Sequence, residues 1–312
     1  MAFTAFRDMK PFPQLMFSAF IILICFLVAM VISMIVAIPL FGFDSMFDIT
    51  GVIDFSDPDS IRVLKYFQVV QSIGLFIVPP VILGWMFYGK IAEYLHLDRN
   101  FRFSSVLIAA LLILFAAPLI NFAGELNSRM HFPGWLSGME AWMKSSEEKA
   151  ARLTEAFLKV ETTGGLLFNV FMIAFLPAIG EELLFRGVIQ RIFTRMTRSN
   201  HWGIWISAIL FSALHLQFYG FLPRLLLGVL FGYLLVWSGS MWLPIIGHFL
   251  NNGFAVITMF LIDKNKLTPD IETIGSSSGS YYLAILSFLL IVSLLWLFKN
   301  QNRGREFLPD RN

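Results

Sequence analysis

Residues 166–186 read LLFNVFMIAFLPAIGEELLFR, an apolar run that ends in two adjacent carboxylates and an arginine. A membrane-spanning helix needs about 20 apolar residues, so the length of this run suits one. A charge inside the membrane costs roughly 3 kcal/mol on insertion scales, and charges without a purpose are therefore rare there. We interpret Glu181, Glu182 and Arg186 as functional candidates. The alternative is that they only end a helix at the membrane interface.

The spacing of these three charges separates their roles. Glu182 and Arg186 are four residues apart, which puts them on one helix face with the acid on the N-terminal side, the favourable order for an ion pair. Glu181 points about 100° away from that face. If Arg186 neutralises Glu182, then Glu181 is the acid that remains for chemistry.

The composition indicates a membrane protein. The chain has 312 residues, of which 57% are hydrophobic and 14% are charged, and its mean hydropathy is +0.72. Soluble domains carry about 25% charged residues, so we predict an all-α, polytopic membrane protein whose partner is the lipid bilayer. The net charge of +2 gives no reason to expect a nucleic acid partner. The single cysteine, Cys25, excludes a disulfide framework within the chain.

A ruler of about 20 apolar residues finds about eight candidate spans. They lie at residues 15–41, 66–88, 104–123, 165–186, 203–219, 221–238, 241–262 and 280–298. The first run is much longer than a signal-peptide core, and we interpret it as a retained helix.

These spans divide the chain into four segments. We predict N-terminal transmembrane helices 1–3, an amphipathic surface connection, a catalytic core of helices 4–7, and a last helix with a cytoplasmic tail, at residues 1–130, 131–163, 164–265 and 266–312. In the connection, apolar residues recur at helical spacing between charged ones, which fits a helix lying on the membrane surface. We interpret it as a connector, with a substrate gate as the alternative.

Eight spans place both termini on one side of the membrane. That side collects the larger share of the 23 Lys and Arg residues, whereas the first loop on the other side is acidic. The positive-inside rule therefore predicts that both termini are cytoplasmic.

Two later apolar runs also carry polar residues. His215 follows Phe211 by four residues, so the two rings share a helix face. His248 and Asn252 are also four apart, and an imidazole and a carboxamide together can donate hydrogen bonds to one oxyanion. A satisfied core histidine or a polar contact between helices would explain either set alone. Three separate runs with such residues indicate one shared site. No zinc-protease, serine-hydrolase or phosphate-loop motif occurs in the sequence.

In order and spacing, these residues resemble the three motifs of the CPBP family of intramembrane proteases. The family contains the Rce1-type CAAX prenyl endopeptidases and Abi-like bacterial relatives associated with bacteriocin processing and immunity. The motifs are Glu181-Glu182-x-x-x-Arg186, Phe211-x-x-x-His215 and His248-x-x-x-Asn252, and the resemblance covers about residues 165–260.

The resemblance implies catalytic roles for the polar residues of all three motifs, which are Glu181, Glu182, Arg186, His215, His248 and Asn252. The first glutamate and the second-motif histidine would activate a water, and the third-motif pair would form the oxyanion hole. The ion pair of the first motif would support the site. Phe211 is a candidate substrate contact.

The implied activity is hydrolysis of a peptide bond near the C-terminus of a membrane-associated, CAAX-like substrate, in a bacterial cytoplasmic membrane and without a cofactor. One alternative is a metalloprotease in which Glu181, His215 and His248 hold Zn²⁺ with a bound water. A non-enzymatic transporter is another, because polar intramembrane residues also line ion pathways. A bacteriocin-immunity protein is the third.

The depth of the two water-activating residues sets a condition on this prediction. If the fourth helix ended at Arg186, Glu181 would lie near the cytoplasmic end and His215 near the opposite one. They meet only if that helix continues through residues 191–196, or if it is kinked at Pro177 and Gly180.

Overall fold

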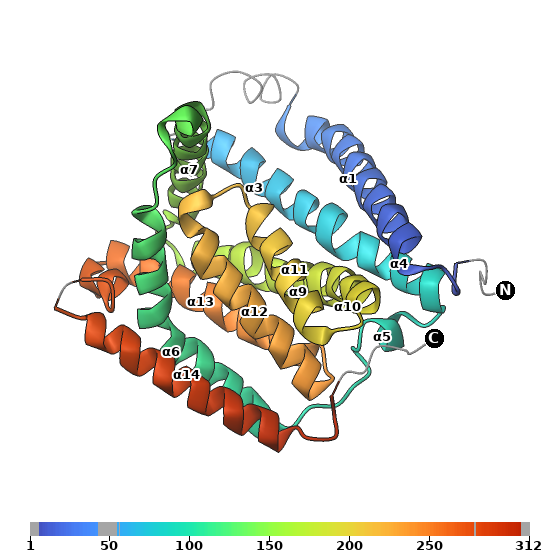
Figure 1. The fold of residues 1–312 in the computed structure, drawn as a ribbon. Coiled ribbons are helices and arrows are strands. Elements are labelled where there is room, and N and C mark those ends of the chain that lie inside the picture. The colour runs from blue at the N-terminus through green and yellow to red at the C-terminus, as the bar shows by residue number, and fades with distance from the viewer. Residues whose placement is uncertain (1–5, 43–54, 56, 278, 307–312) are drawn as a thin grey trace.

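The computed structural model describes residues 6–42, 55, 57–277 and 279–306, and in these ranges the chain consists of helices and their connections (Figure 1). This confirms the all-α prediction. Seven helices in the described ranges are long and apolar enough to cross a membrane. They are α1 (Pro11–Phe41), α3–η1–α4 (Pro58–Tyr88), α6 (Phe103–Ser128), α8 to α10 (Thr163–Thr197), η5–α12 (Phe218–Ser238), α13 (Trp242–Asp263) and α14 (Tyr281–Gln301).

The predicted fifth span, residues 203–219, is wrong as a membrane-crossing helix. Helix α11 runs from Asn200 to Ala213 and has 14 residues. At 1.5 Å per residue it is about 21 Å long, shorter than the hydrocarbon core of about 30 Å. After it the chain turns through Leu216, whose φ is 54°, into the single 3₁₀ turn η5 (Phe218–Gly220) and then α12 (Phe221–Ser238). His215, just after α11, therefore lies between the two ends of the bundle and not at its far end.

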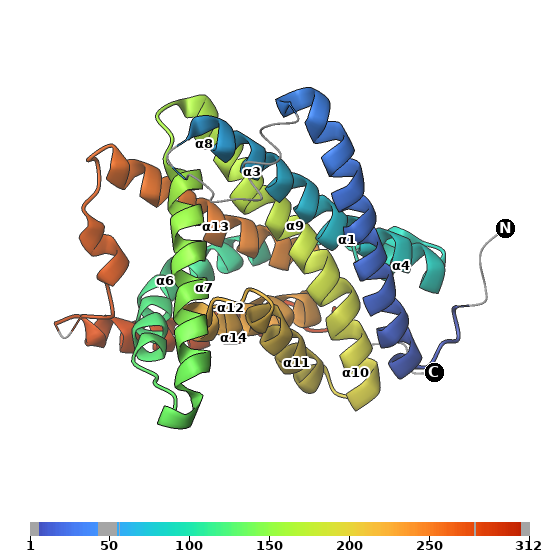
Figure 2. The same ribbon diagram turned by 90° about the horizontal axis from the view of Figure 1, so that it is seen from above.

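The short helix α11 still reverses the direction of the chain. The beginning of α1 and the end of α10 meet, where Arg195 Nη1 donates to Gln14 Oε1 at 2.9 Å. At the other end of the described chain, Arg305 Nη1 donates to the backbone oxygen of Asn100, in the connection before α6, at 3.0 Å. In both views the beginning of α1 and the end of α14 lie toward the same side of the bundle (Figures 1 and 2). That this end is cytoplasmic stays a prediction.

The fourth span is longer than predicted. Instead of ending at Arg186, it continues to Thr197, for 35 residues in all. It comprises α8 (Thr163–Asn169), α9 (Leu176–Glu182) and α10 (Arg191–Thr197), separated by the π-helical segments η3 (Val170–Phe175) and η4 (Leu183–Gln190). The helix thus fulfils the continuation that the sequence required, and Glu181 lies close to its midpoint.

This long helix is the centre of the bundle. Every residue from 182 to 192 is buried, and a helix that is buried on all sides must be enclosed by others. Leu183 packs in a cluster with Leu83 and Leu235, whereas its neighbour Leu184 packs with Phe211. Helices α1 and α14 lie at the edges of the bundle, where most of their apolar side chains are exposed to the surroundings, as expected of lipid-facing helices.

Two further helices complete the described chain. The four-residue α5 (Ile91–Tyr94) follows α4 (Val78–Tyr88), and α7 (Ser137–Leu158) is the amphipathic helix predicted between the third and fourth spans. The short 3₁₀ turns η2 (Gly134–Leu136) and η6 (Pro269–Thr273) lie before α7 and before α14. Helix α7 contacts α3, η5 and α13, and Figure 2 shows it passing in front of α13.

Candidate functional site

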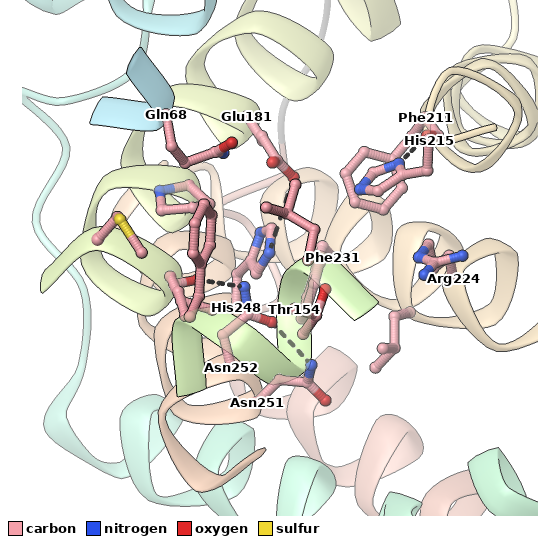
Figure 3. Close-up of a pocket in the computed structure, with 16 residues that line it drawn as sticks. Gln68, Thr154, Glu181, Phe211, His215, Arg224, Phe231, His248, Asn251 and Asn252 are labelled. Carbon is pink, nitrogen blue, oxygen red and sulfur yellow. Dashed lines mark hydrogen bonds and ion pairs between the residues drawn. The ribbon is translucent and has the colours of Figure 1, made fainter. Parts of the chain in front are cut away.

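A cavity of about 350 Å³ opens within the bundle, and the predicted motifs meet at it (Figure 3). Glu181 reaches it from α9, His215 from the turn after α11, and His248 and Asn252 from α13. Phe211 also contributes to its wall. The structure therefore brings together residues that lie far apart in the sequence, at a depth made possible by the long fourth span and the short α11.

Glu182 and Arg186 do not line the cavity but lie behind it. The ion pair expected from their spacing is present, because Arg186 Nη1 donates to Glu182 Oε1 at 2.9 Å. The same carboxylate oxygen is 2.8 Å from His248 Nδ1. Arg186 Nη2 donates to the backbone oxygen of Gly228 on α12 at 3.1 Å. Glu182 is fully buried and Arg186 is 2% exposed, so the pair is shielded from solvent.

Aromatic rings enclose this charged network. The Arg186 guanidinium carbon lies 4.7 Å from the centre of the Phe211 ring and 5.5 Å from that of Phe231, within the range of cation–π attraction. Phe231 also stacks on the His248 imidazole, with 5.1 Å between ring centres and 16° between planes. Phe211 is 4% exposed. Its most evident contacts are thus with Arg186 and neighbouring rings, and its role as a substrate contact stays a prediction.

The hydrogen bond to Glu182 fixes the tautomer of His248. An ionised carboxylate can only accept, so Nδ1 of His248 carries a hydrogen in this arrangement. The other ring nitrogen, Nε2, lies 3.9 Å from Oε2 of Glu181. This distance is too long for a hydrogen bond, but it couples the two groups electrostatically.

His215 is oriented by its own helix. Its Nδ1 donates to the backbone oxygen of Phe211 at 2.7 Å, which leaves Nε2 with a lone pair in the neutral ring. The ring packs edge-on against that of Phe211, at 4.8 Å between centres. Among the described residues, no hydrogen bond joins His215 to Glu181. They share the cavity without direct contact.

Asn252 is held by the π-helical segment η3 of the fourth span. Its Nδ2 donates to the backbone oxygen of Ile173 at 3.1 Å. In a regular helix that oxygen would accept from the residue four positions later, but this residue is Pro177, which has no N–H. Asn252 Oδ1 accepts from Asn251 Nδ2 at 3.1 Å. Because an amide nitrogen has two hydrogens, one N–H of Asn252 remains for another partner.

Sequence reasoning missed several residues of the cavity wall. Arg224, Gln68 and Asn251 are polar, and Thr154 comes from α7. Arg224 is a lone charge in the apolar run 221–238, so the reasoning that selected Glu181 would have found it as well.

The connector interpretation of α7 was incomplete. Leu153, Thr154 and Phe157 form part of the cavity wall, so α7 is a structural part of the site. Its end is fixed where Asn169 Nδ2 donates to the backbone oxygen of Phe157 at 2.7 Å. Lys65 on α3 in turn donates to Asn169 Oδ1 at 2.9 Å.

The residues do not fit the alternative zinc site. In the described part of the chain, no three His, Cys, Asp or Glu side chains are grouped closely enough to hold a metal ion. We therefore derive no step that involves zinc.

Comparison with known proteins finds a family model that matches the segment carrying this site. Residues 163–254 match the family described as type II CAAX prenyl endopeptidase Rce1-like. The chain is also 29% identical over 86 residues to the uncharacterized protein YpbD of Bacillus subtilis (strain 168), a match that covers 26% of this chain and 41% of that protein. The match thus spans less than half of the relative's length. No solved structure matches the chain.

Proposed function

We propose, from the match of residues 163–254 to the Rce1-like CAAX prenyl endopeptidase family, that the protein is an intramembrane endopeptidase. It hydrolyses a peptide bond near the C-terminus of a membrane-associated substrate, which enters from the bilayer or its cytoplasmic face. The observation that carries this proposal is the convergence of Glu181, His215 and His248 on one cavity inside an apolar bundle. An ionisable side chain is costly at that depth, so its presence there indicates a function.

Glu181 and His215 are suited to activate a water. The carboxylate of Glu181 accepts no hydrogen bond from the described residues, and its side chain is 12% exposed, so its oxygens remain available within the cavity. Nε2 of His215 presents a lone pair. In the proposed step, the water oxygen attacks the scissile carbonyl carbon while its proton passes to Glu181 or His215. The proton then moves to the leaving amine as the C–N bond breaks.

Asn252 and His248 are suited to stabilise the oxyanion of the tetrahedral intermediate. Asn252 retains one amide hydrogen for the oxyanion. Its other amide hydrogen is donated to the backbone oxygen of Ile173, which holds the carboxamide in place. His248 can donate from Nε2 only when both ring nitrogens carry hydrogen, so its contribution depends on its protonation. Loss of one oxyanion donor typically lowers kcat by about 10²–10³-fold.

Glu182 and Arg186 act as positioning residues in this proposal. The shared oxygen Oε1 of Glu182 sets the ring orientation of His248, and Arg186 fixes Glu182 to the backbone of α12 through Gly228. Neither lines the cavity, so neither needs to touch the substrate.

The test compares wild type with Glu181→Gln and His215→Gln on a quenched farnesylated CAAX peptide, in detergent, with mass spectrometry of the products. We expect one cleavage near the peptide C-terminus by wild type and at least a hundredfold less by each variant. Glu125→Gln is the matched control, since Glu125 lies outside the cavity and pairs with Arg129.

Two outcomes would contradict the proposal. The first is that folded wild type cleaves neither this peptide nor a membrane-peptide library, which would favour the transporter or immunity alternatives. The second is that a strong chelator abolishes cleavage, which would restore the metalloprotease alternative.

A further inference from the structure

Arg224 is the one charged residue of α12, and the catalytic scheme above does not use it. It lies in the first turn of that helix, where the positive end of the helix dipole disfavours a cation. Its side chain is half-buried and lines the same cavity as Glu181 and His215. Neither the helix nor the membrane environment favours a cation at this position.

The partners of Arg224 leave its charge uncompensated. Nη1 donates to the backbone oxygen of Gln217 at 3.0 Å, and Nη2 donates to Gln217 Oε1. Both acceptors are neutral. Among the described residues no carboxylate lies within ion-pair distance of the guanidinium, although Glu147 and Glu181 are close enough to influence it electrostatically. In the part of the chain that the structure describes, no acceptor is assigned to the other three of the five guanidinium hydrogens.

The buried Arg186 differs from Arg224 in its partners. Arg186 has a carboxylate, a carbonyl oxygen and two aromatic rings around it, and its charge is fully compensated within the protein. An arginine in a low-dielectric setting without a counter-charge is costly, and planar carboxylates are the groups that its fork of donors binds best.

Arg224 lines the cavity in which we propose that the peptide bond is cleaved. Figure 3 shows Arg224 and His215 on one side of the cavity, Asn251 and Asn252 on the other, and Glu181 at the top of the view. A peptide whose scissile carbonyl lies at Glu181 can therefore reach toward Arg224 with one end.

We propose that Arg224 is a specificity-determining residue that binds a carboxylate of the peptide substrate on the side of the cavity that it shares with His215, opposite Asn252. This deepens the proposed function and rests on it. The carboxylate has two possible sources, the free C-terminus of the peptide or an acidic side chain. A cavity of about 350 Å³ is at the small end of ligand-pocket sizes, which suits the short end of a chain and favours the C-terminal carboxylate.

The test measures binding, so that it does not depend on turnover. The probes are three fluorescein-labelled peptides: one ending in farnesyl-Cys-Ala-Ala-Leu as the free acid, its C-terminal amide, and an amide with Glu in place of the final Leu. Kd is measured by anisotropy for wild type, Arg224→Gln, Arg224→Lys and the control Arg152→Gln. Arg152 is an exposed cation on α7 whose loss removes a charge without changing the cavity.

We expect wild type and Arg152→Gln to bind the free acid at least tenfold more tightly than the plain amide. Arg224→Gln should bind acid and amide within about threefold of each other, with an unchanged Kd for the amide, and Arg224→Lys should keep part of the difference. Recovery of tight binding by the Glu-containing amide would assign the carboxylate to a side chain. A purely structural role for Arg224 would weaken all three peptides equally.

Equal Kd values for acid and amide with wild type would overturn the proposal, as would an acid preference that survives Arg224→Gln. Binding and cleavage separate the two hypotheses. If the acid preference depends on Arg224 but no peptide is cleaved, the carboxylate site stands and the endopeptidase function fails. If peptides are cleaved without any acid preference, the function stands and the role of Arg224 is wrong.

Discussion

Glu182→Gln removes a charge that two buried groups share. Oε1 of Glu182 accepts from Arg186 at 2.9 Å and from His248 at 2.8 Å. Glu182 is fully buried, Arg186 is 2% exposed and His248 is 4% exposed. Glutamine has nearly the same shape and keeps one oxygen that can accept both bonds. The substitution therefore changes the charge while it changes the packing very little.

The cost of this change comes from Arg186. Without the negative charge of Glu182, its guanidinium keeps only neutral hydrogen-bond acceptors and the two aromatic faces, in a setting that excludes solvent. Breaking a buried ion pair by removing one partner costs about 3–5 kcal/mol. Taking about 2–4 °C per kcal/mol for domains of 150–250 residues, we expect Tm to fall by roughly 10 °C.

The assay is thermal unfolding in detergent, followed by intrinsic fluorescence of the 8 tryptophans. Two further variants complete a double-mutant cycle: Arg186→Met alone, and Glu182→Gln combined with Arg186→Met. The double variant has no unpaired charge, so it should be more stable than the sum of the two single losses by about 2 kcal/mol or more. Glu125→Gln is the exposed control and should cost at most about 1 kcal/mol.

A Tm for Glu182→Gln within about 2 °C of wild type would refute this reasoning, because it would mean that Arg186 does not depend on the carboxylate. Additive losses in the double variant would refute it as well. In either case Glu182 would no longer explain the orientation of His248.

Three further predictions follow from particular contacts. Asn252→Ala should lower kcat by about 10²–10³-fold, measured on the same peptide at saturating concentration, whereas an unchanged kcat would remove Asn252 from the oxyanion site. Gly203→Ala should lower Tm and activity together, because its Cβ would lie 2.0 Å from Thr194 Oγ1 and 2.9 Å from Thr194 N, whereas Gly253→Ala has open space and should match wild type. Burial and nearby arginines lower the pKa of His96, in the connection after α5, to about 4. The neutral imidazole therefore contributes its full stabilisation of the fold above pH 6.5, and this contribution is lost as the pH falls toward 4. His96→Asn, which tolerates the φ of 56° at this position, should abolish about 2 kcal/mol of the loss in stability between pH 7 and pH 4.5, and an identical pH dependence of Tm in the two proteins would contradict this.

The local part of the site could be predicted from the sequence. The ion pair between Glu182 and Arg186 follows from a spacing of four residues on one helix, and the shared face of Phe211 and His215 follows in the same way. These relations depend only on helix geometry. The structure contains both contacts.

The path of the chain through the membrane was harder to predict. Hydropathy treats residues 203–219 as one apolar run. It does not detect that the chain changes direction at Leu216, whose backbone has a left-handed conformation. It likewise ended the fourth span at Arg186, since it assigns the same cost to a charge whether or not a partner neutralises it. Both errors concern tertiary contacts, and together they decide the depth of His215 and Glu181.

The bond between Glu182 and His248 was also beyond the sequence, because it joins residues 66 positions apart on different helices. The same holds for the part of α7 in the cavity wall. Its helical periodicity predicted an amphipathic helix, but periodicity does not specify what the apolar face contacts. Here that face covers the cavity with Leu153 and Phe157.

Whether Glu181 is the base is decided by the rate constant of Glu181→Gln relative to wild type, on one farnesylated CAAX peptide in proteoliposomes. We expect wild type to cleave the peptide and the variant, folded to the same Tm, to be slower by about 10²–10⁴-fold, because the group that takes the proton of water is gone. A variant that cleaves within tenfold of wild type would show that Glu181 is not the base, and would contradict the account.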